Sequence, residues 1–212
     1  KNIFKNDGLV KKLLAAETLG SVSTLLTDKT GTLTEGRMKL EKIIPVSDPE
    51  KVLIANAYAN EAIVERNGDK FSVKGEATDQ AKLEAFLAGG FDLKKMLDLT
   101  PRINFLPFDS DLKFMASFHK AKDAHGDAVH VYVSGAPEII LDRSSDFPEK
   151  ENMRREFENL AQQGFRVIAA GEEILAGGHE EIAKRSDKEL AGLVQNLTFL
   201  GLAAIRDPIR ED

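Results

Sequence analysis

The feature that most constrains the fold is a series of short strand-like segments along the chain. An Asn67–Gly68 turn between two extended segments, residues 64–75, predicts a β-hairpin. Alternating or apolar runs of strand length recur along the chain at 38–46, 103–120, 128–134, 165–174 and 197–207. Neighbouring strands joined by hairpins predict an antiparallel sheet rather than a parallel one.

Helical patterns are interspersed with these strands. Longer helices are expected at 49–60, 76–90 and 148–164, and shorter ones after Pro137 and at 186–194. Thr78 is the expected N-cap of the 76–90 helix, and Gly164 ends the 148–164 helix. The expected fold class is therefore α+β, an antiparallel β-sheet flanked by helices.

Composition narrows the function classes. The chain has 212 residues, 42% of them hydrophobic, with a formal net charge of −6 and no cysteine. This balance favours a globular core, argues against a nucleic-acid partner and excludes disulfides. No apolar run approaches the ~18 residues of a membrane span. Because the chain begins at Lys1 rather than Met, we expect it to be a piece of a longer protein.

The N-terminal part carries a second structural signal. Residues 7–19 have the periodicity of an amphipathic helix, and 21–27 form an apolar, β-branched run that predicts a buried strand ending at Asp28. The polar segment that follows, residues 28–36, combines the Asp28 and Glu35 carboxylates, one ammonium, three threonines and two glycines. A carboxylate at the carboxyl end of a strand stands where open α/β sheets place ligands.

These residue types suit phosphate chemistry. Asp28 could act as a nucleophile that becomes phosphorylated, with Lys29 balancing charge and the Thr30 and Thr32 hydroxyls bonding phosphate oxygens. Gly31 permits close approach of the backbone to an anion, and Mg²⁺ would balance the charge. Taken alone, the same residues also fit a polar turn at a strand end.

The string D-K-T-G-T-L-T, Asp28 to Thr34, is identified as the phosphorylation motif of P-type ATPases. There is neither a Walker loop nor a G-x-G-x-x-G sequence. Other family segments resemble this chain in order: V-E-T-L-G, G-E-A-T-E, E-F-S-R-D-R-K-S-M, K-G-A-P-E, G-x-R-x-L-A-x-A and D-P-P-R correspond to residues 15–22, 74–81, 106–116, 133–143, 164–171 and 201–212. The resemblance covers essentially the whole chain, and the K-G-A-P-E-like element points to the P2-type, calcium-pump-like group.

The resemblance implies functional residues. Asp28 would be the phosphorylated nucleophile, assisted by Lys29, Thr30 and Thr32, and Mg²⁺ would be held by Asp28 and Thr30. The implied ATP-binding residues are Asp79, Phe108, Lys113, Met115, Ser134, Gly135, Arg166, Ile168 and Asp207.

Strand alternation agrees with part of this set. It places Lys113 and Met115 on one face, and Phe114, Ala116 and Phe118 on the other as core. Taken singly, Phe108 and Met115 also fit core positions, and Lys113 and Arg166 also fit solvated charges.

Two positions depart from the family pattern. Ser134 stands where K-G-A-P-E has its lysine, which we expect to remove an ammonium from the pocket and to make nucleotide binding weaker or less sensitive to salt. Ile209 replaces the second proline of D-P-P-R, which leaves that hinge less rigid.

The implied organisation has three parts. Residues 1–35 would begin a haloacid-dehalogenase-like phosphorylation domain, 36–206 would be an inserted nucleotide-binding domain, and 207–212 would return to the first. The parent would be an integral membrane protein that moves a cation through helices absent from this chain, with this chain as a cytoplasmic portion beside actuator and remaining phosphorylation domains. Because the later T-G-D and G-D-G-x-N-D segments are not in this sequence, we expect nucleotide binding without turnover.

Two other classes remain open. One is a soluble haloacid-dehalogenase-type phosphatase with a large cap, which shares the Asp-x-Thr-Gly-Thr pattern. Such phosphatases carry a second Asp two positions after the nucleophile, where this chain has Thr30. The other is a non-catalytic nucleotide-sensing module.

Overall fold

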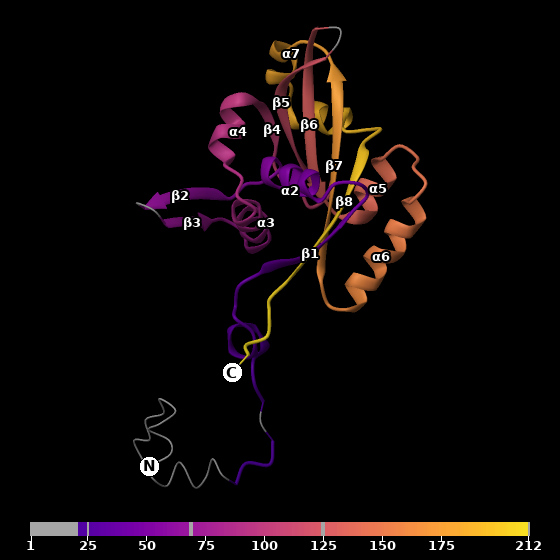
Figure 1. Cartoon of the computed structure of the whole chain (residues 1–212). Coiled ribbons are helices and arrows are strands. Elements are labelled where there is room, and N and C mark those ends of the chain that lie inside the picture. Colours follow the sequence, from indigo (N-terminus) through magenta and orange to yellow (C-terminus); the bar gives the residue numbers. More distant parts are fainter. Residues whose placement is uncertain (1–20, 25, 68–69, 124–125, 212) are drawn as a thin grey trace. The chain divides into compact units, whose positions relative to one another are not determined.

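The computed structural model describes residues 21–24, 26–67, 70–123 and 126–211 (Figure 1). The chain divides into two compact units, Arg37–Pro208 and a smaller one formed by Lys1–Gly36 with Ile209–Asp212. The joints expected from the sequence, 35/36 and 206/207, lie next to this division. The helix expected at 7–19 lies outside the described residues.

An antiparallel sheet forms the centre of the larger unit. Its six strands follow the order β1-β8-β7-β6-β5-β4, with every neighbouring pair antiparallel. Their bounds are β1 (Lys39–Pro45), β4 (Arg102–Leu106), β5 (Phe114–Asp123), β6 (Gly126–Gly135), β7 (Arg166–Ala176) and β8 (Thr198–Arg206). A separate hairpin pairs β2 (Ile63–Asn67) with β3 (Lys70–Lys74), as the Asn67–Gly68 turn predicts.

The sequence of β1 suits its place at one edge of the sheet. Pro45 cannot donate a ladder hydrogen bond, and it lies in β1, which is an edge strand. It pairs with Gly201 of β8, whose φ is +148°. A Cβ at Gly201 would lie 2.4 Å from the Ile44 carbonyl oxygen, so the close approach of these strands requires glycine there.

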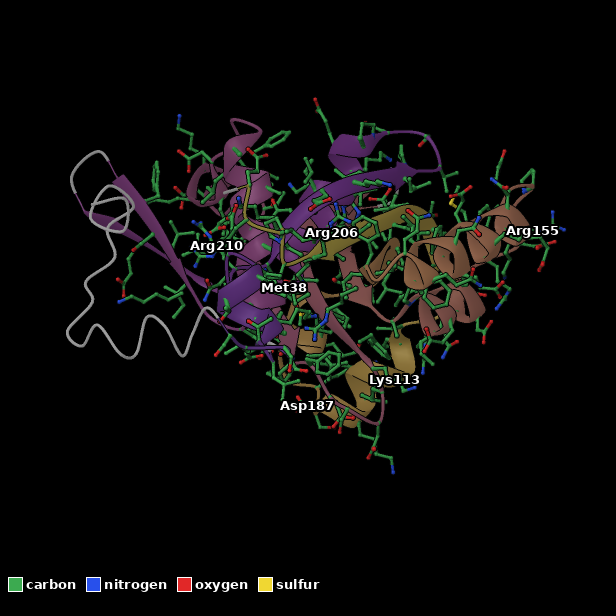
Figure 2. All side chains as sticks on the ribbon, turned by 90° about the horizontal axis from the view of Figure 1, so that it is seen from below. Met38, Lys113, Arg155, Asp187, Arg206 and Arg210 are labelled. Carbon is green, nitrogen blue, oxygen red and sulfur yellow. The ribbon has the colours of Figure 1, made fainter. Side chains whose placement is uncertain are left out.

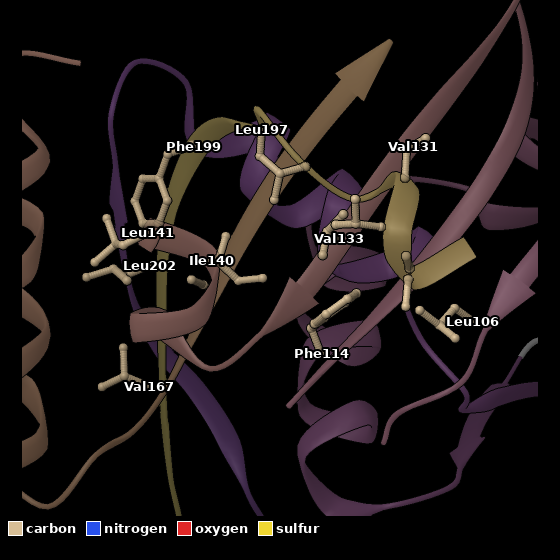
Figure 3. Packing of buried hydrophobic residues seen from close by; sticks show 14 of the residues in the cluster. Leu106, Phe114, Val131, Val133, Ile140, Leu141, Val167, Leu197, Phe199 and Leu202 are labelled. Carbon is tan, nitrogen blue, oxygen red and sulfur yellow. The ribbon is translucent and has the colours of Figure 1, made fainter. Parts of the chain in front are cut away.

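Helices cover both faces of the sheet. On one face lie α2 (Pro49–Tyr58), α3 (Ala77–Ala88) and α4 (Leu93–Leu99); α5 (Pro137–Arg143), α6 (Lys150–Gln162), α7 (His179–Ala183) and α8 (Asp187–Leu193) pack on the other. In β6, Val131 and Val133 point into the larger core beneath α5 to α8 (Figure 3), while Tyr132 packs with α2. This alternation is the period of two that strands impose.

The antiparallel α+β class, a sheet flanked by helices, is confirmed. The short helices α4 and α7 were not predicted from the sequence. Among the described residues, no helix has the length and apolar character needed to cross a membrane.

Three local predictions are wrong. The described residues of 21–27 form no strand, because no strand of the described chain lies alongside to satisfy the backbone hydrogen bonds. Thr78 is not the N-cap of α3; Glu76 is, and its carboxylate accepts from the Thr78 amide at 2.7 Å. The expected strand 103–120 is interrupted by a loop at 107–113, which separates β4 from β5.

Candidate functional site

A cavity of about 610 Å³ lies within the larger unit, beside the start of α3 and the adjoining ends of β5, β6 and β7. Its volume is in the range of small-molecule sites. It is lined by Glu61, Glu76, Thr78, Asp79, Lys82, Phe108, Lys113, Met115, Ser134, Gly135, Ala136, Pro137, Glu138, Phe157, Arg166, Val167 and Ile168. All the nucleotide residues expected from the resemblance, with the exception of Asp207, therefore meet at one cavity.

The lining changes from exposed to buried along the cavity. Phe108 is 51% exposed, and Lys113 and Arg166 are also exposed. In contrast Asp79, Lys82 and Ser134, which we call the polar floor, are 4%, 2% and 1% exposed. The cavity thus offers an open end with an aromatic ring and two cations, and a closed polar end.

The polar floor is organised by the Lys82 ammonium. Its Nζ lies 2.8 Å from Asp79 Oδ1, one helical turn earlier on α3, and it donates to Ser134 Oγ at 3.1 Å and to the Ala59 carbonyl at 3.3 Å. Burial lowers the pKa of Lys82, and the Asp79 carboxylate opposes that shift. A buried charge of each sign is therefore balanced by the other.

Neighbouring groups fix the partners of Lys82 in turn. Asp79 Oδ2 accepts from the Glu61 amide at 3.2 Å. Ser134 Oγ donates to Asn56 Oδ1 at 2.7 Å, and the Asn56 side-chain amide donates to the Val52 carbonyl within α2. The floor is thus held by contacts with α2, α3 and β6.

Lys82 was missed by the sequence analysis, and it corrects the expectation for Ser134. Ser134 was expected to leave the pocket one ammonium short, but the Lys82 Nζ lies beside its hydroxyl. The available signal was the i,i+3 spacing between Asp79 and Lys82, which places both on one side of α3.

The first turn of α3 holds Arg166 at the open end. Arg166 Nη1 donates to Thr78 Oγ1 at 2.5 Å and lies 3.3 Å from Glu76 Oε1. Burial alone would raise the pKa of Glu76, but hydrogen bonds from Thr78 and the charge of Arg166 bring it below its usual range. Arg166 and Ile168 lie on the more exposed side of β7, while Ala169 is fully buried.

Lys113 takes its position from a turn rather than from strand alternation. Its φ is +59°, an uncommon value for a residue with a Cβ, and its amide donates to the Asp109 carbonyl at 2.7 Å. Its Nζ lies 3.8 Å from Glu138 Oε1. Lys113 and Met115 both line the cavity, as expected, but strand alternation is the wrong reason for Lys113, because β5 begins at Phe114.

The rest of the β5 interpretation is confirmed, and it shows why the cavity exists. Phe114, Ala116 and Phe118 are fully buried in the larger core, while Met115 faces the cavity. Gly135 pairs with Phe114, and a Cβ there would lie 2.5 Å from the Lys113 carbonyl oxygen. The cavity wall therefore needs glycine at this point.

Asp207 lies away from this cavity. Its Oδ1 accepts from the Arg37 amide at 3.1 Å, which joins the two ends of the larger unit. This contact places Asp207 at the ends of the larger unit rather than in the cavity lining.

The motif around Asp28 belongs to the smaller unit. Lys29–Leu33 form one irregular turn, η2, in which Gly31 has φ +76° and every residue is exposed. The buried Thr34 closes the turn, since its Oγ1 accepts from the Gly31 amide at 3.1 Å and donates to the Lys29 carbonyl at 3.2 Å.

The C-terminal strand segment contacts the same turn. Ile209 forms a β-bridge with Thr34, and Arg210 donates to the carbonyls of Thr34 at 3.1 Å and Gly31 at 3.2 Å. Arg210 was not singled out by the sequence analysis. Within the described chain, Asp28 has an exposed side chain, and no group of three or more His, Cys, Asp or Glu is placed to hold a metal ion.

Comparison with known proteins identifies the family of this chain. The profile of a family described as "P-type ATPase, cytoplasmic domain N" matches residues 49–212. Since this is more than half of the sequence, the chain belongs to that family.

Curated relatives point to the same class. The chain is 26% identical to "Cation-transporting ATPase pma1" of Synechocystis over 253 aligned positions, covering 98% of this chain and 26% of the relative. It is 27% identical to "Probable cation-transporting ATPase F" of Mycobacterium tuberculosis, covering 97% and 26%. It is 30% identical to the human "Sodium/potassium-transporting ATPase subunit alpha-2", covering 99% and 24%. The chain thus spans about a quarter of the length of these relatives.

Proposed function

We propose that this chain is the ATP-binding portion of a cation-transporting P-type ATPase, of the P2 type, and that ATP binds in the cavity lined by Asp79, Phe108 and Arg166. The observation that carries the proposal is the convergence of residues from α3, the β4–β5 loop, β6 and β7 on that one cavity. The transported cation, the membrane helices and the remaining domains belong to the proposal for the complete protein.

The exposed end suits both parts of the nucleotide. The half-exposed Phe108 ring offers a stacking surface for adenine, with Met115 and Ile168 as apolar neighbours. Lys113 and Arg166 are the nearby cations for the phosphates. Asp79, at the closed end, presents carboxylate oxygens to the far edge of the base.

The proposed chemistry in the complete protein is phosphoryl transfer to Asp28. A carboxylate oxygen of Asp28 attacks the γ-phosphorus, a new P–O bond forms, and the bond from that phosphorus to the bridging oxygen breaks as ADP leaves. Lys29 supplies positive charge at the nucleophile, and the Thr30 and Thr32 hydroxyls are donors for phosphate oxygens. Hydrolysis of the aspartyl-phosphate would follow, and the phosphorylation domain would be of the haloacid-dehalogenase-like class.

Mg²⁺ fits this segment only in part. Asp28 offers a carboxylate and Thr30 a backbone carbonyl, both exposed, while Mg²⁺ takes six oxygen ligands. When bound, the ion would neutralise phosphate charge; in this chain it depends on oxygens from the nucleotide and water. We therefore propose that the isolated chain binds ATP and does not turn it over.

Calorimetric titration of ATP tests the binding proposal. Phe108→Ala and Arg166→Ala should each weaken binding at least tenfold, on the order of 1.4 kcal/mol. Phe71→Ala, on β3 with a similarly exposed ring, and Arg155→Ala, on α6 (Figure 2), are matched controls that should bind as the wild type does. Equal binding by all four variants would show that ATP does not bind in this cavity. Hydroxylamine-sensitive phosphorylation of the isolated chain would contradict the proposed lack of turnover.

A further inference from the structure

Phe108 and Lys113 lie at the two ends of one turn at the open end of the cavity. β4 ends at Leu106 and β5 begins at Phe114, so neither residue belongs to a strand. Both residues are exposed. The directions of their side chains are therefore set by the turn between them and not by the sheet.

The Asp109 side chain organises this turn. Its Oδ1 accepts from the amides of Asp111 at 2.8 Å and Leu112 at 2.9 Å. The Asp109 carbonyl accepts from the Lys113 amide at 2.7 Å. This is the arrangement of a single helical turn with an N-cap carboxylate, in which a side-chain oxygen satisfies amides that the backbone leaves unpaired.

The far end of the turn is joined to the rest of the larger unit. Leu112 is partly buried against the larger core, and the Lys113 carbonyl accepts from the Ala136 amide, at the start of α5, at 2.9 Å. The φ of Lys113, +59°, is the left-handed conformation that commonly ends a helical turn. The bonds of the Asp109 carboxylate therefore tie the exposed Phe108 end of the turn to an end that the core holds.

We propose that Asp109 is a positioning residue for nucleotide binding: its side-chain oxygen closes the turn, so that the Phe108 ring and the Lys113 ammonium are presented to the ligand together. The inference rests on the proposed function, since it concerns the same cavity. Asp109 is not among the described residues that line the cavity. It acts by ordering the two contacts before the nucleotide binds, which avoids the cost of ordering them during binding.

A purely electrostatic role of Asp109 predicts the opposite sign. A carboxylate near the open end would repel the phosphates of a nucleotide, so its removal would strengthen binding. In the positioning role, removal weakens binding because the hydrogen bonds to Asp111 and Leu112 are lost. Asparagine separates charge from hydrogen bonding, because its side-chain oxygen can accept the same two bonds without a charge.

Calorimetric titration of the 212-residue chain with ATP, without Mg²⁺, tests the proposal. Asp109→Ala removes the acceptor and should weaken ATP binding about fivefold, as expected when a cap that holds the binding conformation is lost. Asp109→Asn keeps the acceptor and should bind within about twofold of the wild type. Asp111→Ala is the matched control, since it removes an exposed carboxylate of the same turn that accepts none of these bonds, and it should bind as the wild type does.

Amide hydrogen exchange of the free chain measures the turn directly. In Asp109→Ala, the Leu112 amide should exchange faster than in the wild type, because its acceptor is missing, whereas the amides of β6 should exchange as before. Asp109→Asn should restore the slower exchange of Leu112. Unchanged exchange of Leu112 in Asp109→Ala would overturn the proposed role of the carboxylate.

The outcomes separate this inference from the proposed function. If Phe108→Ala weakens ATP binding but Asp109→Ala binds within about twofold of the wild type, the positioning role is wrong and the proposed function stands. Stronger binding by Asp109→Ala, or equal losses in Asp109→Ala and Asp109→Asn, would also overturn the positioning role. An equal loss in Asp111→Ala would overturn it as well, because that carboxylate does not close the turn. A wild type that does not bind ATP would overturn the proposed function and this inference with it.

Discussion

The segment around Asp28 and the cavity of the larger unit differ in how specific their sequence motifs are and in how many structural partners their residues have. Asp28 to Thr34 carry the most specific motif in the chain, yet Asp28 is exposed and the described residues before it form no strand. Asp79 belongs to a weaker motif, yet it is buried, paired with Lys82 at 2.8 Å and hydrogen-bonded to the Glu61 amide. A strong motif identifies chemistry, but a site is built only where surrounding elements supply partners.

The largest expected effect is at the buried pair. Lys82→Met leaves the Asp79 carboxylate buried without its cation, which should lower the free energy of unfolding by about 3–5 kcal/mol. Chemical unfolding at neutral pH measures this. The double variant Asp79→Asn/Lys82→Met removes both charges and should recover part of the loss. A loss below about 1 kcal/mol in the single variant would show that the buried Asp79 carboxylate does not depend on the charge of Lys82.

A second effect concerns His119, which also lies on the α2 side of the sheet. Its Nδ1 donates to the Thr100 carbonyl at 2.8 Å, and the Ser117 hydroxyl donates to Nε2 at 2.7 Å, which fixes a neutral ring. Burial lowers the pKa of His119 to about 4. The unfolded chain, with an ordinary histidine pKa near 6.5, therefore binds more protons between these two values.

The stability of the fold should accordingly fall as the pH falls from about 6.5 to 4. Through this residue alone, the free energy of unfolding should be about 2 kcal/mol lower at pH 5 than at pH 7.5. Urea unfolding of the wild type and of His119→Phe, at several pH values, measures this. The variant should be less stable at pH 7.5 and show a flatter profile in that window. Parallel profiles would contradict the assignment to His119.

The smallest expected effect is at Asp28. Because its side chain is exposed within a turn whose described hydrogen bonds come from Thr34 and Arg210, Asp28→Ala should change the free energy of unfolding by less than about 0.5 kcal/mol. ATP affinity of the isolated chain should also be unchanged. A tenfold loss of affinity would show that the Asp28 segment takes part in ATP binding together with the cavity.

The sequence predicted most of the sheet and the longer helices, because β1, the β2–β3 hairpin, β7 and α6 have clear periodicity and punctuation. It did not predict α4 and α7, which are seven and five residues long. The run 21–27 has strand composition, but a strand also requires a partner, and that depends on residues elsewhere.

Most of the named residues that line the cavity were predicted from the sequence, but the backbone structure that positions them was not. Phe108 and Lys113 were interpreted by strand alternation, whereas a turn fixed by Asp109 places them. Lys82 was overlooked because a single lysine in a helix usually contacts solvent. Its burial results from the packing of α3 against α2 and β1 and from the contact of its Nζ with Ser134 of β6, and pairwise spacing along one helix cannot reveal that packing.

The most direct test is an NMR titration of the labelled chain with ATP in the absence of Mg²⁺. If ATP binds in the cavity, the backbone amide signals of Asp79, Met115, Gly135 and Ile168 should shift in a saturable manner, while those of Gly31 to Thr34 stay close to their starting positions. Saturable shifts confined to the segment around Asp28, or no saturable shifts in the cavity, would contradict the account.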